Sequence, residues 1–564
     1  MKKQTIKVLS LIAVSGALAT GCKLLKDVDY VATPNPLEMH GDSVRVKVDI
    51  TFGEKGIHKK AAAEITPMLG SHALKPIRVQ GEKSTGNGDV IQYKAGGSVT
   101  YTDIIAYSSD MEVSELSITG KVFKGTIEKD VIPETKIADA TVITPFLVKK
   151  DFKVLISTDQ FQRVTEQSFS AQLNYAKGKS AVSSAELKED DIKAYEAFLN
   201  NAQSDVKVAI KSISITGFAS PEGEEDKNNT LSTERANAAK ESSMAIAKQA
   251  ENEAAAGDIY STNGSGEDYA GFKVALEADT EMNEDDKNLV LRVLETITSP
   301  TERETAMRDM GKTFSYLDKN IFPMLRRAEM VTVYDQTGFS DEELVALSTS
   351  NPDTLNLEEL LFTAALSTDL NEQLRVYKIA ETRFPEDYRT SNNVGAILYK
   401  QNKLSEAKTQ FEKANGIQDN PISKNNLGAI AGLEGDRVKA MELLDQAEGT
   451  TETNYNKGIL NILDGNYTDA VSNLSEEKTY NNSLANLLAG DAVAAKAIVD
   501  NSMEAETAMG DYLKAVIAAS EDNLQGVVSN LKNCFSKDAS YKAKAQKDRT
   551  FLKYASDAAL TAIM

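Results

Sequence analysis

The chain contains 564 residues, of which 41% are hydrophobic, and its formal net charge is −21. This length is enough for three or four domains. The negative charge argues against nucleic acid as a partner, because a phosphate backbone attracts basic proteins. Beyond residue 22 no stretch approaches the roughly 18 consecutive apolar residues of a membrane-spanning helix, so we expect a soluble body.

Residues 1–21 have the pattern of an export signal. Lysines at positions 2, 3 and 7 precede a short apolar run over residues 8–19, and the run ends in Ala19-Thr20-Gly21-Cys22. This tetrapeptide resembles the bacterial lipobox, in which the cysteine becomes the acylated N-terminus. The resemblance implies that Cys22 carries fatty acyl (palmitate-type) chains, which anchor a protein durably when two or more are present. Ordinary secretion, with Cys22 incidental, is the alternative.

If Cys22 is lipidated, Cys534 has no cysteine partner, and no internal disulfide is expected. Cys534 follows an apolar helical pattern, which favours a buried thiol over a reactive one.

The N-terminal part is predicted to be a linker followed by a β-sandwich. Pro34 and Pro36 interrupt residues 22–40, where we expect little packing. In the next stretch, residues 41–160, apolar side chains alternate with polar ones, most clearly from Val44 to Phe52, and Gly-rich turns follow. This alternation is typical of antiparallel strands with one buried face.

Residues 161–338 are predicted to form an α/β domain. Strands are expected near 169–173, 210–218 and 330–334, with helices over 185–200, 230–251, 281–297 and 300–327. Residues 219–229 are expected to form a loop, and the Gly-rich residues 256–270 a flexible excursion.

This segment resembles the C-terminal domain of OmpA-like proteins. The resemblance depends on Gly217-Phe218-Ala219-Ser220, Asn228, Leu231-Ser232, Arg235-Ala236 and the closing run Arg326-Arg327-Ala328-Glu329-Met330. It implies a pocket that binds the peptidoglycan stem peptide, with an inserted helical segment near 255–310.

The resemblance places Arg235 at the family's anion-binding arginine and Ser220 at the position of its aspartate, with Asn228 also in the motif. A serine cannot hold an ammonium group by charge, so Glu222 is a candidate substitute. The site is therefore predicted to comprise Arg235, Ser220, Asn228 and Glu222. Two alternatives remain: the fold persists without peptidoglycan binding, or Arg235 pairs with the acidic loop and stiffens it.

Residues 339–564 are predicted to be all helical and repetitive. Gly395, Gly428 and Gly458 recur 33 and then 30 residues apart, each followed by small residues at fixed offsets. The pattern is similar to the tetratricopeptide repeat (TPR), which implies a solenoid whose concave groove binds a protein partner. A structural spacer is the alternative. Asn392, Asn393, Asn425 and Asn426 are predicted to face the groove, although they could equally be solvated or cap helices.

No catalytic, cofactor or metal motif is present in the sequence: the three histidines lack zincin spacing, and there is no nucleophile elbow or P-loop. We therefore expect a non-catalytic protein without a cofactor. The combination resembles outer-membrane lipoproteins of Bacteroidota. Residues 23–26, Lys-Leu-Leu-Lys, do not resemble that phylum's acidic surface-export signal, so we expect a periplasm-facing body. Two functions compete: linking the membrane to the cell wall while binding proteins, or serving as an assembly scaffold that does not bind peptidoglycan.

Overall fold

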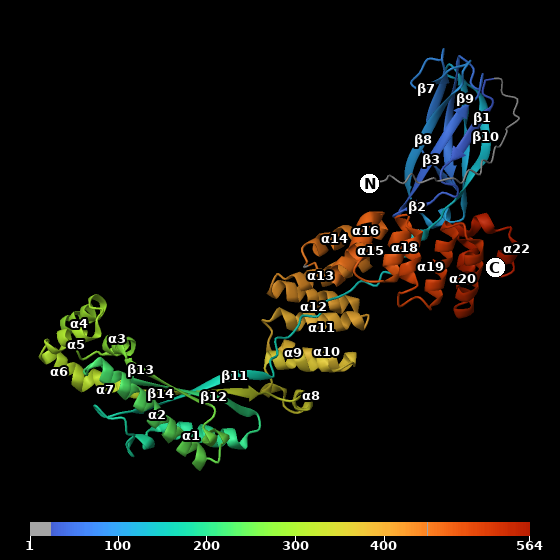
Figure 1. Ribbon diagram of the computed structural model, residues 1–564. Coiled ribbons are helices and arrows are strands. Elements are labelled where there is room, and N and C mark those ends of the chain that lie inside the picture. Colours follow the sequence, from blue (N-terminus) through green and yellow to red (C-terminus); the bar gives the residue numbers. More distant parts are fainter. Residues whose placement is uncertain (1–23, 448) are drawn as a thin grey trace. The chain divides into compact units, whose positions relative to one another are not determined.

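The computed structural model describes residues 24–447 and 449–564, which form two compact units (Figure 1). The first unit joins the residues up to Thr158 with Ser367–Met564, and the second spans Asp159–Leu366. Each unit is described by itself. Residues 1–21 and Cys22 lie outside the described residues, so the export signal and the lipid anchor stay predictions.

The first unit begins with a β domain made of two facing sheets. One sheet contains β1 (Val28–Ala32), β2 (Met39–His40), β3 (Ser43–Phe52) and β8 (Gly97–Ala106). The other contains β4 (Ala61–Leu69), β5 (His72–Ala73), β6 (Ile77–Gly81), β7 (Asp89–Ile91), β9 (Ser114–Lys124) and β10 (Ile127–Ala140). All pairs are antiparallel except β6 with β7.

The alternation of apolar and polar residues from Val44 to Phe52 arises because one face of β3 is buried. In β3 the side chains of Val44, Val46, Val48, Ile50 and Phe52 are buried in one core shared with the second sheet. The two sheets agree with the predicted β-sandwich, and β3 has the single buried face that its alternation predicts.

The prediction that residues 22–40 are a loosely packed linker is wrong for the described part. β1 pairs along β3, from Val28 opposite Phe52 to Ala32 opposite Val48, and the side chain of Leu37 is fully buried. Pro34 and Pro36 interrupt the backbone only between β1 and β2, so strand pairing proceeds on either side of them.

After β10 the chain forms a short 3-10 helix, η2 (Thr144–Leu147), and then runs without regular secondary structure to Thr158. Residues 149–157 of this run are called the groove segment below. The β domain had been expected to continue to residue 160, but its last strand ends at Ala140.

Helical hairpins make up the remainder of the first unit. The helices are α10 (Leu370–Arg383), α11 (Tyr388–Lys400), α12 (Leu404–Ile417), α13 (Pro421–Glu434), α14 (Arg437–Asp445), α15 (Thr451–Asp464), α16 (Tyr467–Leu474), α17 (Tyr480–Leu488), α18 (Ala492–Val499), α19 (Ala508–Ser520), α20 (Leu524–Lys537), α21 (Tyr541–Lys547) and α22 (Ala558–Thr561), with 3-10 helix η7 (Arg549–Tyr554) before the last. Gly395, Gly428 and Gly458 lie against Phe411, Leu444 and Leu474 of the following helix. The predicted all-helical solenoid is confirmed.

The second unit is built on a mixed sheet with strand order β11-β14-β12-β13. Its strands are β11 (Val164–Asn174), β12 (Val208–Ala219), β13 (Tyr260–Glu267) and β14 (Arg327–Thr337). The helices are α1 (Asp190–Ser204), α2 (Glu225–Gln249), α3 (Tyr269–Ala278), α4 (Glu284–Thr296), α5 (Pro300–Arg308), α6 (Lys312–Tyr316), α7 (Phe322–Leu325), α8 (Asp341–Ser350) and α9 (Leu357–Leu366). The α/β character of the segment is confirmed.

Several boundaries in this unit differ from the prediction. The expected flexible excursion over 256–270 contains β13, because Ile213 to Gly217 of β12 offer a parallel edge to Tyr260–Gly264. The helix expected from Thr230 begins at Glu225, and the stretch 300–327 is broken into several short helices. Helices α8 and α9 had been assigned to the repeats but belong to this unit.

Close contact between α2 and β12 fixes the end of the sheet where the predicted ligand residues lie. A Cβ atom at Gly217 would be 2.0 Å from the Ser232 carbonyl oxygen, so only glycine permits this approach. Among the described residues, no helix is long and apolar enough to cross a bilayer. Cys534 is a free, fully buried thiol in α20, as predicted.

Candidate functional site

The groove segment lies along the first helices of four successive hairpins and is held there by asparagine side chains. Asn393 in α11, Asn426 in α13, Asn456 in α15 and Asn481 in α17 are fully buried. Each accepts a hydrogen bond from the backbone N–H of one segment residue and donates one to the carbonyl oxygen of that same residue. We call these residues the clamp asparagines.

The clamp distances are short and regular. Asn393 holds Ser157 at 2.8 and 2.9 Å, and Asn426 holds Leu155 at 2.7 and 2.8 Å. Asn456 holds Lys153 at 2.6 and 2.8 Å, and Asn481 holds Lys149 at 2.9 Å in both directions. The clamps therefore bind the polypeptide backbone and are indifferent to the side chains of the bound residues.

A second set of polar side chains links one clamp to the next. Asn426 donates to Asn392 at 2.9 Å, and Asn456 donates to Asn425 at 3.1 Å. Asn392 and Asn425 also donate to the segment carbonyls of Leu155 and Lys153. A fully hydrogen-bonded buried network of this kind is rigid, and removing any member leaves polar groups unsatisfied.

Side chains of the segment add specific contacts. Phe152 lies against Gly432, where a Cβ atom would be 2.6 Å from the ring, and Tyr399 donates its hydroxyl to the Phe152 carbonyl at 2.9 Å. Asp151 accepts a hydrogen bond from Tyr455 at 2.7 Å, and Lys149 pairs with Glu504. The aromatic ring of Phe152 is thus the apolar anchor of the segment.

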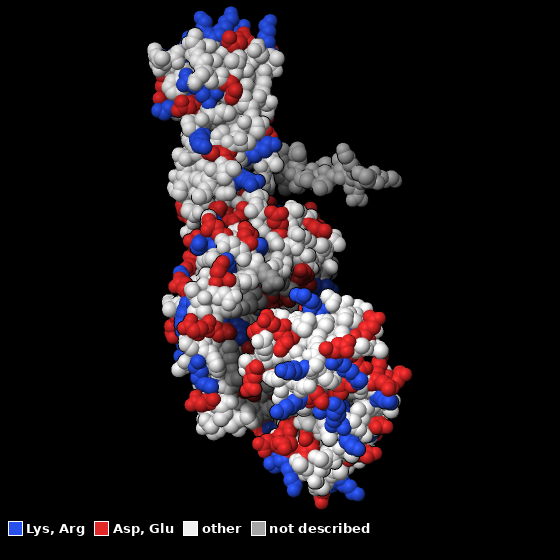
Figure 2. Space-filling model, turned by 90° about the vertical axis from the view of Figure 1, so that its left-hand side faces the viewer, with Lys and Arg blue, Asp and Glu red and all other residues white. Residues whose placement is uncertain are grey.

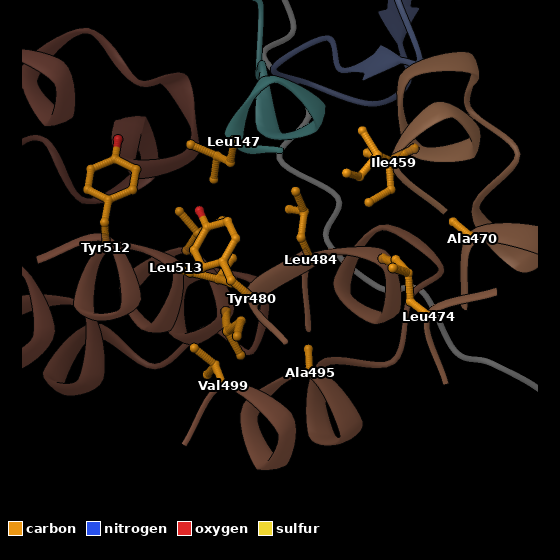
Figure 3. Packing of buried hydrophobic residues seen from close by; sticks show 14 of the residues in the cluster. Leu147, Ile459, Ala470, Leu474, Tyr480, Leu484, Ala495, Val499, Tyr512 and Leu513 are labelled. Carbon is orange, nitrogen blue, oxygen red and sulfur yellow. The ribbon is translucent and has the colours of Figure 1, made fainter. Parts of the chain in front are cut away.

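Just before the segment, Leu147 joins the apolar core of the repeats. Figure 3 shows Leu147 directed toward Leu513, Tyr480 and Leu484 of the hairpins, and all of them belong to one buried cluster. The β domain also contacts the repeats directly: the backbone N–H of Gly41 donates a hydrogen bond to the Tyr467 hydroxyl oxygen at 2.9 Å, and the ring of His40 lies beside the ring of Tyr467.

The structure places Asn392, Asn393, Asn425 and Asn426 in the groove, buried against the chain's own backbone. Sequence reasoning missed Asn456 and Asn481, and it missed the occupant. The signal was present: positions 393, 426 and 456 repeat the glycine spacing, each two residues before a repeat glycine.

In the second unit, the predicted ligand residues gather where β12 meets α2. Arg235 of α2 is 1% exposed and donates to backbone carbonyls of Phe218 at 2.7 Å, Lys179 at 3.0 Å and Ala176 at 3.4 Å. Its guanidinium also lies over the Tyr175 ring. Burial lowers the pKa of Arg235 to about 10, and the Glu222 carboxylate opposes that shift. Arg235 is thus cationic at neutral pH and held by its own fold.

Ser220 and Glu222 meet at Arg326, which sequence reasoning did not assign to the site. Arg326 donates to the Ser220 hydroxyl at 3.2 Å and contacts Glu222 at 3.0 Å and Asp318 at 2.9 Å. The side chains of Arg326 and Glu222 are 8% and 9% exposed. The other carboxylate oxygen of Glu222 has no hydrogen-bond partner among the described residues.

Asn228 closes the loop before α2. It donates to the carbonyls of Ser220 and Gly223, both at 3.2 Å, and to the Glu267 carboxylate at 2.8 Å. Burial raises the pKa of Glu267, whereas the hydrogen bond from Asn228 lowers it. Beside Asn228 lies a shallow, open hollow lined by Gly178, Gly223, Glu224, Asp226, Lys227, Thr230, Leu231 and Glu234.

The structure thus brings the predicted site residues together, but each of Arg235, Ser220 and Asn228 is engaged within the fold. A ligand is not needed to satisfy them. The sequence allowed Arg235 to pair with the acidic loop, but its guanidinium donates to backbone carbonyls. The ion pair with Glu222 is made by Arg326. The peptidoglycan role of these residues stays a prediction.

No protein-family description and no curated protein sequence matches the chain. Among solved structures, a tetratricopeptide repeat protein from Parabacteroides merdae is 13% identical, covering 47% of this chain and 99% of its own, with a TM-score of 0.28. YrrB, described as a TPR protein with an unusual peptide-binding site, is 17% identical, covering 37% and 100%, with a TM-score of 0.22. Yeast Tom70 is 10% identical, covering 59% and 84%, with a TM-score of 0.25.

Proposed function

We propose that this protein is a non-catalytic assembly scaffold whose repeats hold extended polypeptide by its backbone. The observation that carries the proposal is the row of clamp asparagines, each binding the N–H and C=O of one residue. Such contacts impose an extended conformation without selecting side chains, so a partner segment would satisfy them as well as residues 149–157 do. In this proposal the scaffold is lipid-anchored through Cys22 to a bacterial outer membrane and faces the periplasm.

Partner binding then has to proceed by exchange, because the groove is filled. The groove segment is tethered to the repeats, which gives it an effective concentration on the order of millimolar against any free peptide. Weakening the tethered segment should therefore expose the clamps. Phe152 is the best position for this, since its ring is 3% exposed and truncating such a residue costs about 3–5 kcal/mol.

The test is the binding of a fluorescent peptide with the sequence of residues 147–158, followed by anisotropy. We expect no binding to the parent chain and measurable binding to Phe152→Ala. Adding Asn426→Leu to that variant should abolish binding, because the clamp on Leu155 is lost. Phe146→Ala is the matched control, since Phe146 is 46% exposed and lies outside the segment. Failure of Phe152→Ala to bind the peptide would contradict the proposal.

A second candidate function is attachment to the cell wall through an OmpA-like second unit. It is supported by the gathering of Ser220, Glu222, Asn228 and Arg235 at one end of the sheet, and by the unpartnered oxygen of Glu222. That carboxylate oxygen could accept a hydrogen bond from the ammonium group of a stem peptide.

Co-sedimentation of the full chain with purified sacculi tests this candidate. We expect Glu222→Gln to weaken sedimentation at least about tenfold, because a hydrogen bond to a charged group contributes about 1.5–3 kcal/mol. Glu241→Gln in α2 is the control, since Glu241 is exposed, makes no ion pair among the described residues and does not line the hollow. Thermal unfolding of both variants checks that the fold is kept. Equal sedimentation of the parent and Glu222→Gln would show that Glu222 does not contribute to binding of the sacculi.

A further inference from the structure

Several loops between the strands lie together at one end of the β domain. Backbone hydrogen bonds join these loops across both sheets: Lys26 to Gly56, Lys55 to Tyr93, and Lys83 to Lys59, at 2.7–2.8 Å. The turn after Lys124 lies at the same end, since Lys124 is opposite Ala61 at the start of β4. We call this end, made of residues 24–27, 53–60, 81–88, 92–97 and 124–127, the basic tip.

The basic tip is rich in lysine within a strongly acidic chain. Its lysines are Lys26, Lys55, Lys59, Lys60, Lys83, Lys94 and Lys124, and its acids are Asp27, Glu54 and Glu82. Figure 2 shows lysine and arginine side chains gathered at this end of the β domain, at the top of the view. The chain as a whole carries −21.

Each acid of the tip is already next to a lysine. Lys26 lies 3.6 Å from Asp27, Lys55 lies 3.4 Å from Glu54, and Lys59 lies 3.6 Å from Glu82. Within the described part of the chain, Lys60, Lys83, Lys94 and Lys124 make no ion pair, and all are exposed. Clustered cations without counter-charges repel one another and attract an anionic surface.

The polypeptide also enters the β domain at this tip. His58 donates its backbone N–H to the carbonyl of Leu24 at 2.8 Å, and Leu25 bridges to Ile57. Cys22 is two residues before Leu24, and two residues span at most about 7 Å. The proposed lipidation site is thus only two residues along the chain from the point where the described residues enter the basic tip.

We infer that the basic tip is a membrane-facing surface that binds the anionic phospholipid headgroups of the bilayer holding the Cys22 lipid. The inference extends the proposed lipid anchor and does not depend on the groove. An acyl anchor combined with a basic patch binds a membrane far more durably than either alone. Each lysine near an anionic surface strengthens binding about fivefold, and salt weakens this attraction.

The test separates the tip from the lipid by using the full chain with Cys22→Ser, which cannot be acylated. Binding is measured by co-sedimentation with vesicles of phosphatidylcholine alone and of phosphatidylcholine with phosphatidylglycerol. The tip variant changes Lys60, Lys83, Lys94 and Lys124 to serine. The matched control changes Lys400, Lys403, Lys478 and Lys532, exposed lysines of the repeats, to serine.

We expect phosphatidylglycerol to strengthen binding of the Cys22→Ser chain, and added salt to reverse the gain. The tip variant should lose at least tenfold in affinity for the anionic vesicles, while the control keeps the parent's affinity. Equal affinity of the parent and the tip variant for the anionic vesicles would overturn the inference. An equal loss of affinity in the control variant would also overturn it, because binding would then depend on charge in general and not on the tip. Neither result depends on whether Cys22 is lipidated.

Discussion

At Gly458 of α15 the packing leaves room for a hydrogen atom and nothing larger. A Cβ atom there would lie 2.4 Å from Cγ of Leu474, whose side chain fills the space between the helices of one hairpin. The repeat glycines therefore set the distance between helices, and the buried leucine or phenylalanine opposite each one determines how a hairpin packs.

Gly458→Ala should destabilise the chain by about 1–3 kcal/mol, because overpacking forces the helices apart. The gain of about 1 kcal/mol in helix propensity only partly offsets this. Urea unfolding followed by helical circular dichroism measures the change. Gly416→Ala in α12 is the control: nothing lies within 4 Å of its Cβ position, so it should be neutral or mildly stabilising. Similar behaviour of the two variants would contradict the packing account.

Cys534 gives a pH-dependent prediction. Burial raises the pKa of its thiol to about 12. Because this exceeds the unfolded value of about 9, the neutral thiol contributes stability that is complete below pH 9 and is lost as the pH rises toward 12. At pH 9 we expect alkylation by iodoacetamide to be at least a hundredfold slower in the native chain than in urea. Comparable rates would show that the thiol is accessible.

At the scale of elements, the groove segment owes its conformation to the helices that hold it. It has no internal hydrogen-bond ladder. The clamp asparagines bind the backbone of Lys149, Lys153, Leu155 and Ser157, and Tyr399 donates to the carbonyl oxygen of Phe152. An extended stretch of this kind is ordered only as long as those side chains remain, since backbone ordering costs about 1–2 kcal/mol per residue.

Asn456→Ala should loosen the segment around Lys153, because it removes the acceptor of the Lys153 N–H at a cost of about 1–3 kcal/mol. The Lys153 carbonyl oxygen keeps its hydrogen bond from Asn425. Hydrogen exchange of the Lys153 amide should become at least tenfold faster. Asn454→Ala, in the same helix, is the control, because Asn454 makes no clamp contact. Unchanged exchange in Asn456→Ala would mean that the clamp does not hold the segment.

The first unit is discontinuous in sequence. Its parts, the residues up to Thr158 and Ser367–Met564, are joined by the groove segment, by Leu147 in the repeat core and by the contact of Gly41 with Tyr467. The second unit is inserted between them along the chain. Covalent continuity through residues 159–366 is thus not what holds the first unit together.

We expect the parts of the first unit to stay associated after cleavage. Protease sites placed after Thr158 and after Leu366, both exposed, would release the second unit from the chain. The β-domain fragment should then co-elute with the repeats in size-exclusion chromatography. Combining Asn393→Ala, Asn426→Ala and Asn456→Ala should shift the fragments toward separate elution. Separation without these changes would show that the interface is too weak.

Local patterns in the sequence were enough to predict elements whose burial is periodic. The alternation from Val44 to Phe52 identifies β3, and the spacing of Gly395, Gly428 and Gly458 identifies the repeats. Features that depend on a distant partner were not predictable: β1 forms because β3 offers it an edge, and β13 because β12 does. The candidate site shows the same division, since the motif located Arg235 and Ser220, but Arg326, the residue before β14, contacts Ser220 from 106 residues further along the chain.

Each clamp asparagine holds its segment residue through the backbone N–H and C=O groups, so the clamps constrain the four bound positions differently from side-chain contacts. Side chains at 149, 153, 155 and 157 can be exchanged in evolution with little effect on the clamps themselves. Proline is the exception at each of these positions, because its ring nitrogen carries no hydrogen to donate. Among homologues, we therefore expect this stretch to vary in composition while proline stays excluded from those places.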